Sequence, residues 1–149
     1  MRNFPVAVRV LAGLTILVVA ACDATGATDG TTPEPTSTIY LAGTSWTLVS
    51  VGGNPPVEGA DAWLAFGANG EITGSTGCNN LIGGYAVDGT ALTFSTIGTT
   101  RKACPGDDLM AQDASVPEAL DNVTGWEVDA DGRLHLTGAT ELVFEPRSA

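Results

Sequence analysis

Apolar and polar residues alternate along most of the chain after about residue 43, in short runs separated by tight-turn sequences. The dipeptides Asn69-Gly70, Asp88-Gly89 and Asp131-Gly132 each lie between two apolar runs, and such dipeptides suit two-residue hairpin turns with positive φ angles. The pattern therefore predicts three β-hairpins. In the flanking strands these residues are expected to face one side of the sheet: Trp46 and Leu48, Leu64 and Phe66, Leu92 and Phe94, Trp126 and Val128, Leu134 and Leu136, and Leu142 and Phe144.

One segment, Asp107 to Asn122, has helical rather than alternating spacing, and acidic residues occupy its first turn, where they favour a helix. Pro117 would delete an internal hydrogen bond, while the run from Ser115 to Glu118 fits a capping box. The helix is therefore expected either to kink or to restart at Ser115. The residues predicted to share its inner face are Leu109, Gln112, Val116 and Leu120.

Together these elements predict the fold class. Strands that are apolar on one face and polar on the other, with one amphipathic helix, indicate a mainly β domain. The expected architecture is a small antiparallel curled sheet or barrel of hairpins, with the helix covering an end or an edge. At 149 residues the chain is long enough for one such domain and, once a leader is removed, too short for two.

The first 21 residues have the organisation of a secretory signal. Arg2 and Arg9 are followed by the apolar run Val10 to Ala21, which is shorter than the ~20 residues that a transmembrane helix needs. The sequence Val19-Ala20-Ala21-Cys22 resembles a lipobox, the cleavage site of lipoprotein signal peptidase. That resemblance implies removal of residues 1–21 and acylation of Cys22 with palmitate-type chains. An ordinary secretory signal followed by a cysteine is the alternative.

The mature chain is then expected to have two parts. Residues 22–40 are rich in Thr, Pro, Gly, Ala and acidic residues without apolar periodicity, which predicts a lipidated Cys22 followed by a disordered tether. As a flexible coil this tether would span on the order of 20 to 25 Å. Residues 41–146 form the predicted domain, held by the N-terminal lipid on the extracytoplasmic face of a cell membrane.

Charge narrows the choice of partners. The whole chain has a formal net charge of −11, and without the leader four basic residues face 17 acidic ones, for a net charge of −13. Such an acidic chain is not expected to bind nucleic acid or to be held on anionic lipid by basic residues. Acylation is then the predicted membrane attachment, and the acidic surface is explained by solubility alone.

Three cysteines leave one unpaired thiol in an exported protein. If lipid occupies Cys22, then Cys78 and Cys104 are free to form a disulfide, as the oxidising exterior favours. Two separate buried thiols are the alternative, because spacing alone does not establish pairing.

Four parts of the sequence occur in a characteristic order: Trp46-Thr47-Leu48, Gly74 to Asn80 with Gly84-Tyr85, Thr99 to Cys104, and the Leu120 region. In that order and at those separations they resemble the META domain family, which includes heat-shock lipoproteins of the HslJ type. The resemblance covers about Leu41 to Glu145 and implies a compact antiparallel β-barrel-like domain with one helix, found in envelope proteins linked to stress tolerance, secretion or motility. It implies no shared catalytic reaction. The chain departs from the family in having Gln112-Asp113 and Pro117 where a helical glutamate is common.

Within these motifs Trp46, Gly77, Asn79, Tyr85 and Arg101 are the candidate motif residues. Glycines there would permit bends and close backbone approach, and Asn79 or its neighbour Asn80 would cap a turn. Arg101 is the best candidate for a functional contact, since a guanidinium can hold a carboxylate or phosphate. Pairing with an internal acid or backbone carbonyl is the favoured interpretation.

Few residues of the chain are suited to catalysis or to holding a metal or cofactor. His135 is the only histidine and is predicted to lie on the polar side of its strand as a lone surface residue, so it provides no zinc site. Asp129 to Gly132 begins like a calcium loop but is better explained by a hairpin turn, and no nucleophile elbow or phosphate loop occurs. We therefore expect no catalytic residue, no metal and no cofactor.

The predicted function is that of a non-enzymatic envelope lipoprotein, a stress-tolerance or envelope-integrity module that contacts another envelope protein. The first alternative is a barrel that binds a small apolar ligand of unknown identity among Trp46, Trp63 and Tyr85. The remote alternative is an unrecognised hydrolase.

Overall fold

The computed structural model describes residues 41–148. The predicted signal sequence, the lipidation site Cys22 and the tether lie outside the described residues.

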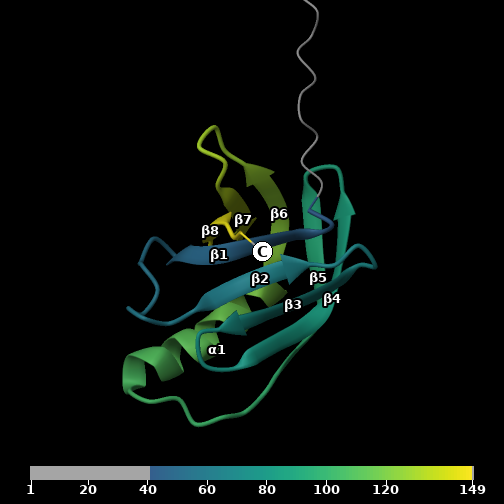
Figure 1. Ribbon diagram of the computed structural model, residues 1–149. Coiled ribbons are helices and arrows are strands. Elements are labelled where there is room, and N and C mark those ends of the chain that lie inside the picture. The colour runs from purple at the N-terminus through teal and green to yellow at the C-terminus, as the bar shows by residue number, and fades with distance from the viewer. Residues whose placement is uncertain (1–40, 149) are drawn as a thin grey trace, which may run out of the picture. The chain divides into compact units, whose positions relative to one another are not determined.

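Eight strands form a closed antiparallel barrel (Figure 1). Each strand pairs with its neighbour in sequence, and β8 returns to pair with β1, which closes the ring. The predicted mainly β fold with one helix is confirmed. The strands are β1 (Thr44–Val51), β2 (Ala62–Phe66), β3 (Glu71–Thr76), β4 (Asn80–Asp88), β5 (Ala91–Thr99), β6 (Val123–Val128), β7 (Leu134–Gly138) and β8 (Leu142–Pro146).

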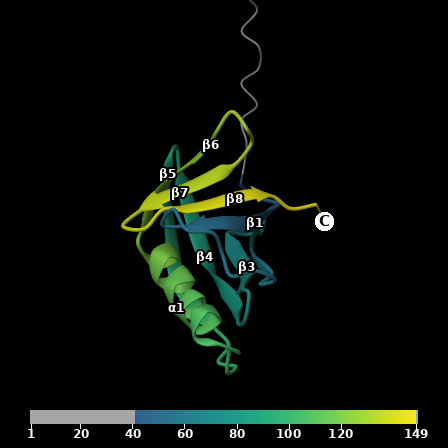
Figure 2. The same ribbon diagram turned by 90° about the vertical axis from the view of Figure 1, so that its left-hand side faces the viewer.

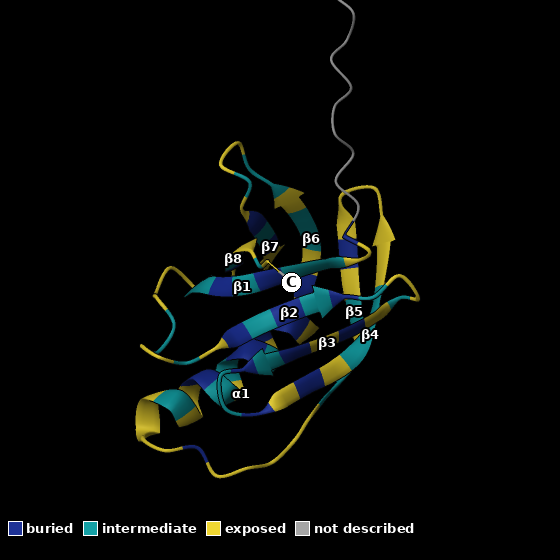
Figure 3. Cartoon of the chain, in the orientation of Figure 1, coloured by how far each residue is buried: buried dark blue, intermediate teal, exposed yellow. Residues whose placement is uncertain are grey.

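The barrel interior is filled by the apolar residues that alternate along the strands. Figure 3 shows buried and exposed residues alternating along the ribbon arrows. Phe66 and Phe144 are the largest side chains with less than 2% exposure, and the predicted inward residues Phe94, Trp126 and Val128 are only partly buried against this core. A small barrel filled in this way is held together by apolar burial from every strand.

The helix α1 (Asp107–Asp121) connects β5 to β6 and packs against β5 and β3. Figure 2 shows it outside the ring of strands. Strands β5 and β6 pair in register only at Ala91 and Gly125. The helix therefore covers core residues that a longer β5–β6 pairing would have covered. Its buried residues are Gln112, Val116, Ala119 and Leu120.

Pro117 lies inside this helix without ending it. The predicted restart at Ser115 is wrong, because the Ser115 hydroxyl donates a hydrogen bond of 3.2 Å to the carbonyl of Gln112 instead of capping a new helix. Burial of Val116 and Leu120 on the core side explains why the helix continues past the proline. Among residues 41–148, no helix has the length and apolar character to span a membrane.

The three predicted hairpins are present, but their turns differ from the two-residue form with two positive φ angles. Only the glycine of each dipeptide has a positive φ: 81° at Gly70, 61° at Gly89 and 80° at Gly132. The chain uses longer loops after β2 and β6, and the β4–β5 turn is formed by Gly89 and Thr90 because Asp88 still pairs with Ala91. Such turns need left-handed geometry at one position only, and glycine supplies it.

Candidate functional site

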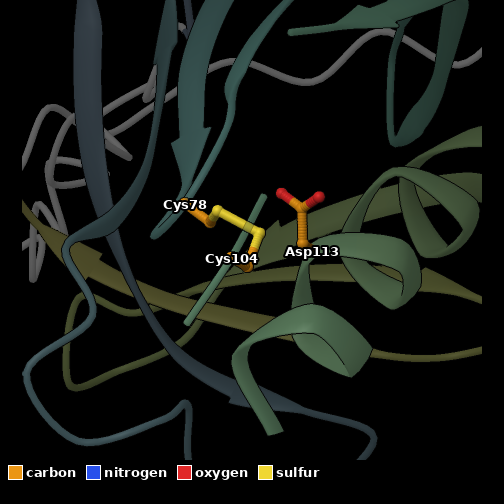
Figure 4. Close-up of side chains that lie close together, drawn as sticks. All are labelled: Cys78, Cys104 and Asp113. Atoms are coloured by element: carbon orange, nitrogen blue, oxygen red, sulfur yellow. A yellow bond between two sulfur atoms is a disulfide. The ribbon is translucent and has the colours of Figure 1, made fainter. Parts of the chain in front are cut away.

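The motif segments converge where the β3–β4 loop, the linker after β5 and the helix α1 meet. Cys78 in the loop and Cys104 in the linker form a disulfide with a Cα–Cα distance of 5.8 Å across 26 residues of sequence. The predicted pairing is therefore present, and the two cysteines are not separate buried thiols. Figure 4 shows the carboxylate of Asp113, on α1, beside this disulfide.

Asn79 is the centre of this arrangement and is 1% exposed. Its side-chain Nδ2 donates to Asp113 Oδ2 at 2.8 Å and to the Lys102 carbonyl at 3.3 Å. Its Oδ1 accepts from Thr100 Oγ1 at 2.8 Å and from the Lys102 amide at 2.7 Å. One buried amide thus binds the loop, the linker and the helix together, and its hydrogen-bonding capacity is fully used.

The helix contributes two polar residues to the same cluster. Asp113 Oδ1 accepts a hydrogen bond from the Thr76 hydroxyl and another, at 3.2 Å, from the backbone N–H of Asn79. Gln112 donates from Nε2 to the Thr76 carbonyl at 2.6 Å and accepts the Val57 amide at 2.7 Å. The Gln112-Asp113 pair therefore connects the helix to the loop at Thr76 and Asn79. Within residues 41–148 no buried side-chain nitrogen or oxygen lacks a partner.

Gly77 is required by the packing around this cluster. Its φ is 96°, and a Cβ built there would lie 2.7 Å from Ala60 Cβ and 3.1 Å from Gln112 Nε2. A left-handed backbone and the lack of space both favour glycine. The motif glycine is thus a structural residue.

The aromatic candidates do not share one cavity. Trp46 is buried in the core and donates from Nε1 to Thr44 Oγ1 at 2.7 Å. The Tyr85 hydroxyl donates to the Gly67 carbonyl at 2.7 Å, its ring meets Phe66 edge-on at 5.0 Å, and burial raises its pKa. Trp63 is only partly buried, between the buried residues Ala62 and Leu64 of β2, and the Arg147 Cζ lies 5.4 Å from its ring centroid. These contacts stabilise the barrel and do not assemble a ligand pocket.

A group of potential metal ligands also occurs at the motif. Ligand atoms of Cys78, Cys104 and Asp113 lie within 4.8 Å of one another. The two sulfurs are bonded to each other, however, so neither is a thiolate, which is the form that binds a metal. The carboxylate is occupied by Thr76 and Asn79, and the group is explained as part of the structural cluster.

Arg101 lies on the linker beside this cluster and is exposed. The favoured prediction, an internal pairing with an acid or a carbonyl, is wrong for the described chain: within residues 41–148 the guanidinium forms neither an ion pair nor a hydrogen bond. The linker is exposed at Arg101, and its backbone at Lys102 is held by two hydrogen bonds to the Asn79 side chain.

His135 is not a lone surface residue. Its Nε2 lies 3.0 Å from Asp129 Oδ2 and its Nδ1 3.1 Å from Glu141 Oε1. Hydrogen bonds to Glu141 and Asp129 raise the pKa of His135, and hydrogen bonds from the Arg133 amide and from His135 lower the pKa of Asp129. Sequence reasoning missed this cluster, although both acids lie six positions from the histidine, across the β6–β7 and β7–β8 hairpins.

The loop Asp129 to Arg133 is the hairpin turn that the sequence predicted in place of a calcium loop. Asp129 Oδ1 accepts hydrogen bonds from the amides of Asp131 at 2.9 Å and Arg133 at 2.8 Å. This carboxylate therefore stabilises the turn, as an aspartate at a turn's start commonly does.

Comparison with known proteins agrees with this description. The profile of the META domain matches residues 40–149. No curated protein matches the chain.

Three solved structures match the chain. An NMR structure of a protein from Burkholderia xenovorans is 27% identical with a TM-score of 0.61, and the match covers 73% of this chain and 85% of that one. A second NMR structure is 28% identical with a TM-score of 0.57, over 70% and 90% of the two chains. A crystal structure of a DUF4847 family protein from Bacteroides vulgatus shares the fold, at 18% identity, a TM-score of 0.52, and coverage of 70% and 93%.

Proposed function

Because this chain belongs to the META domain family, we propose that it is a lipid-anchored envelope protein whose barrel is a non-enzymatic interaction module. One observation carries the proposal. The polar side chains of the motif region form hydrogen bonds within the protein that hold the loop, the linker and the helix together. These side chains belong to Asn79, Gln112 and Asp113. A site built for catalysis would instead aim such groups at a cleft.

The location outside the cytoplasm has two supports. The lipobox-like sequence before Cys22 favours export and acylation. The disulfide between Cys78 and Cys104 is independent of that sequence and is typical of proteins folded in an oxidising compartment. The proposed anchor is therefore a lipid on Cys22, with the barrel on the extracytoplasmic face of the membrane.

The absence of catalysis is also part of the proposal. His135 is the residue best suited to acid–base chemistry, but both of its ring nitrogens are engaged by carboxylates. With a carboxylate at each nitrogen, neither nitrogen is free to take a proton from a nucleophile. The cluster is better explained as a clamp on the hairpins that join β6, β7 and β8.

A ligand-binding barrel is less well supported. Leu64, Phe66 and Phe144 each have at most 2% exposure and fill the interior, while Trp63 lies on the other face of its strand from Leu64. We therefore propose a partner that binds the outer surface, in support of envelope integrity or stress tolerance.

The anchoring is tested by expressing the full chain and its Cys22→Ala variant in a bacterium that processes lipoproteins. We expect the wild-type chain in the membrane fraction, with an intact mass showing loss of residues 1–21 and gain of acyl chains. The variant should be soluble. A wild-type protein that keeps an unmodified Met1 would overturn the anchor.

The interaction is tested by recovering both the full lipoprotein and a form that ends at residue 40 from the same membranes. Partners that require residues 41–149 support the interaction module. Identical partners for both forms would show that the barrel contributes nothing to binding.

A further inference from the structure

The described barrel is strongly acidic, and its few basic residues fall into two groups. Residues 41–148 contain four basic and 14 acidic residues. Arg133 is paired with Glu145 at 3.3 Å, and Arg147 is paired with Asp61 through bonds of 2.6 and 2.9 Å. Arg101 and Lys102 are both exposed and form no such pair within the described residues. The positive charge left available on this acidic surface is therefore concentrated at one dipeptide.

The backbone that carries this dipeptide is held on both sides. The Thr100 hydroxyl and the Lys102 amide both donate to Asn79 Oδ1. The Thr100 amide donates to the Asn80 carbonyl at 3.1 Å, and Cys104 ties the next residues to the loop through the disulfide. Figure 3 shows this linker, between β5 and α1, mostly exposed. Because the ordering of the backbone is already complete in the fold, a ligand of Arg101 need only order its side chain.

The dipeptide lies at the end of the barrel opposite to the one where the described chain begins. Thr44 pairs with Phe66 at one end of β2, and Ala62 at the other end of β2 pairs with Thr76, next to the loop that Asn79 occupies. Thr99, which precedes the linker, pairs with Leu81 at that second end. Within the described barrel, the dipeptide and Thr44 therefore lie at opposite ends.

We propose that Arg101 and Lys102 form the contact site for a carboxylate group of an envelope protein partner. The proposal rests on the interaction function above and specifies its partner. A guanidinium binds a carboxylate through two parallel hydrogen bonds, and an adjacent ammonium adds a third donor. A carboxylate is favoured over a phosphate-rich membrane because attraction to anionic lipid is about 1 kcal/mol per basic residue, and two such residues do not offset 14 acids.

Lys102 makes a direct test possible, because it is the only lysine of the chain. The full lipoprotein in its membranes is treated with a water-soluble carbodiimide, which activates carboxyl groups. If a partner carboxylate lies at the site, the Lys102 amine attacks it. An amide bond then forms, and the reagent takes up the elements of water and leaves as a urea. Mass spectrometry of the digested adduct should show Lys102 joined to an acidic side chain or C-terminus of another protein.

Arg101→Gln and Arg133→Gln form a matched pair of variants. Arg101→Gln should lower the adduct yield about tenfold, the factor that roughly 1.4 kcal/mol of binding represents, whereas Arg133→Gln should leave it unchanged. Circular dichroism of both variants checks that the barrel is intact. An undiminished adduct in Arg101→Gln, a Lys102 link only to acids of the same chain, or no link at all would overturn the carboxylate site.

Two further measurements separate the alternatives. The soluble Cys22→Ala protein is mixed with phosphatidylglycerol vesicles, and binding that depends on Arg101 would overturn the carboxylate in favour of lipid phosphate. The partners recovered through residues 41–149 are compared for wild type and Arg101→Gln. Partners that persist in the variant leave the interaction module standing and remove only this site, whereas a wild-type barrel that recovers no partner removes the proposed function itself.

Discussion

Asn79 and Asp113 join a hairpin loop to a helix 34 residues later through a hydrogen bond of 2.8 Å between the amide Nδ2 and the carboxylate Oδ2. The same Nδ2 lies 3.8 Å from Cys78 Sγ and 3.7 Å from Cys104 Sγ, so the disulfide between these cysteines adjoins the bond. The β5–β6 seam has little strand pairing of its own, so these two links hold the helix over it. The stability of the barrel should therefore depend strongly on this small region.

Replacement of Asn79 tests the polar link. Asn79→Ala leaves Asp113, Thr100 and the Lys102 amide without their buried partner, so we expect a loss of about 2–4 kcal/mol in the free energy of unfolding. Urea denaturation of the soluble Cys22→Ala protein, followed by tryptophan fluorescence, measures it. Asn80→Ala, at the exposed neighbouring position, should change stability by less than about 0.5 kcal/mol. Equal effects of the two changes would contradict the role given to Asn79.

Removal of the disulfide tests the covalent link. Across 26 residues, loss of the cross-link should lower stability by about 3.5 kcal/mol through the greater entropy of the unfolded chain. The comparison is between the oxidised protein and the double variant Cys78→Ala and Cys104→Ala in urea. A reductant should destabilise the first and leave the second unchanged. If the reductant affects neither, the cysteines are not paired in the folded protein.

Alanine substitutions at Gly77 and Gly53 distinguish the cost of backbone strain from the cost of a steric clash. Both have positive φ angles, 96° and 84°, but a Cβ at Gly53 would meet nothing within 4 Å, whereas at Gly77 it would meet Ala60. Gly53→Ala should cost about 1–2 kcal/mol through strain alone. Gly77→Ala should cost roughly 1–3 kcal/mol more, because Ala60 or the helix must move. Thermal or urea unfolding of both variants measures the difference, and no difference would show that the loop yields without cost.

His135 should make stability depend on pH. Glu141 and Asp129 raise the pKa of His135 above the ordinary value of 6.5. At a pH between the unfolded and the folded pKa, the folded protein therefore keeps a proton on His135 that the unfolded chain has released. The stabilising contribution is complete below about pH 6.5 and is lost as pH rises through the folded pKa. The advantage of wild type over His135→Gln should therefore be largest below about pH 6.5 and shrink as pH rises through the folded pKa of His135.

The same titration can be followed directly, because the chain has a single histidine. The imidazole resonance in proton NMR should report a midpoint above 6.5 in the folded protein. Glu141→Gln should move that midpoint down, since Glu141 contributes the largest part of the shift. A midpoint at or below the ordinary pKa would contradict the contacts of His135 with Asp129 and Glu141.

The local structure of this protein could be predicted from its amino-acid sequence. Alternating apolar residues such as Leu134 and Leu136 predicted the strands, glycines at 70, 89 and 132 located three hairpins, and helical spacing located α1 within one residue of its observed end. Cysteine parity pointed to the pair that the structure contains. These signals are readable because backbone geometry and side-chain periodicity act over a few residues.

The closure of the strands into a barrel and the contacts between distant side chains could not be predicted from the sequence. Three contacts depend on how strands are joined around the ring. They are the pairing of β8 with β1, the hydrogen bond between Asn79 and Asp113, and the contacts of His135 with Asp129 and Glu141. The placement of the linker that carries the exposed Arg101 also depends on this assembly, since the Lys102 amide is bonded to Asn79, 23 residues earlier. Such contacts join residues that no local periodicity relates, so a pattern read along the chain predicts the elements but not their meeting points.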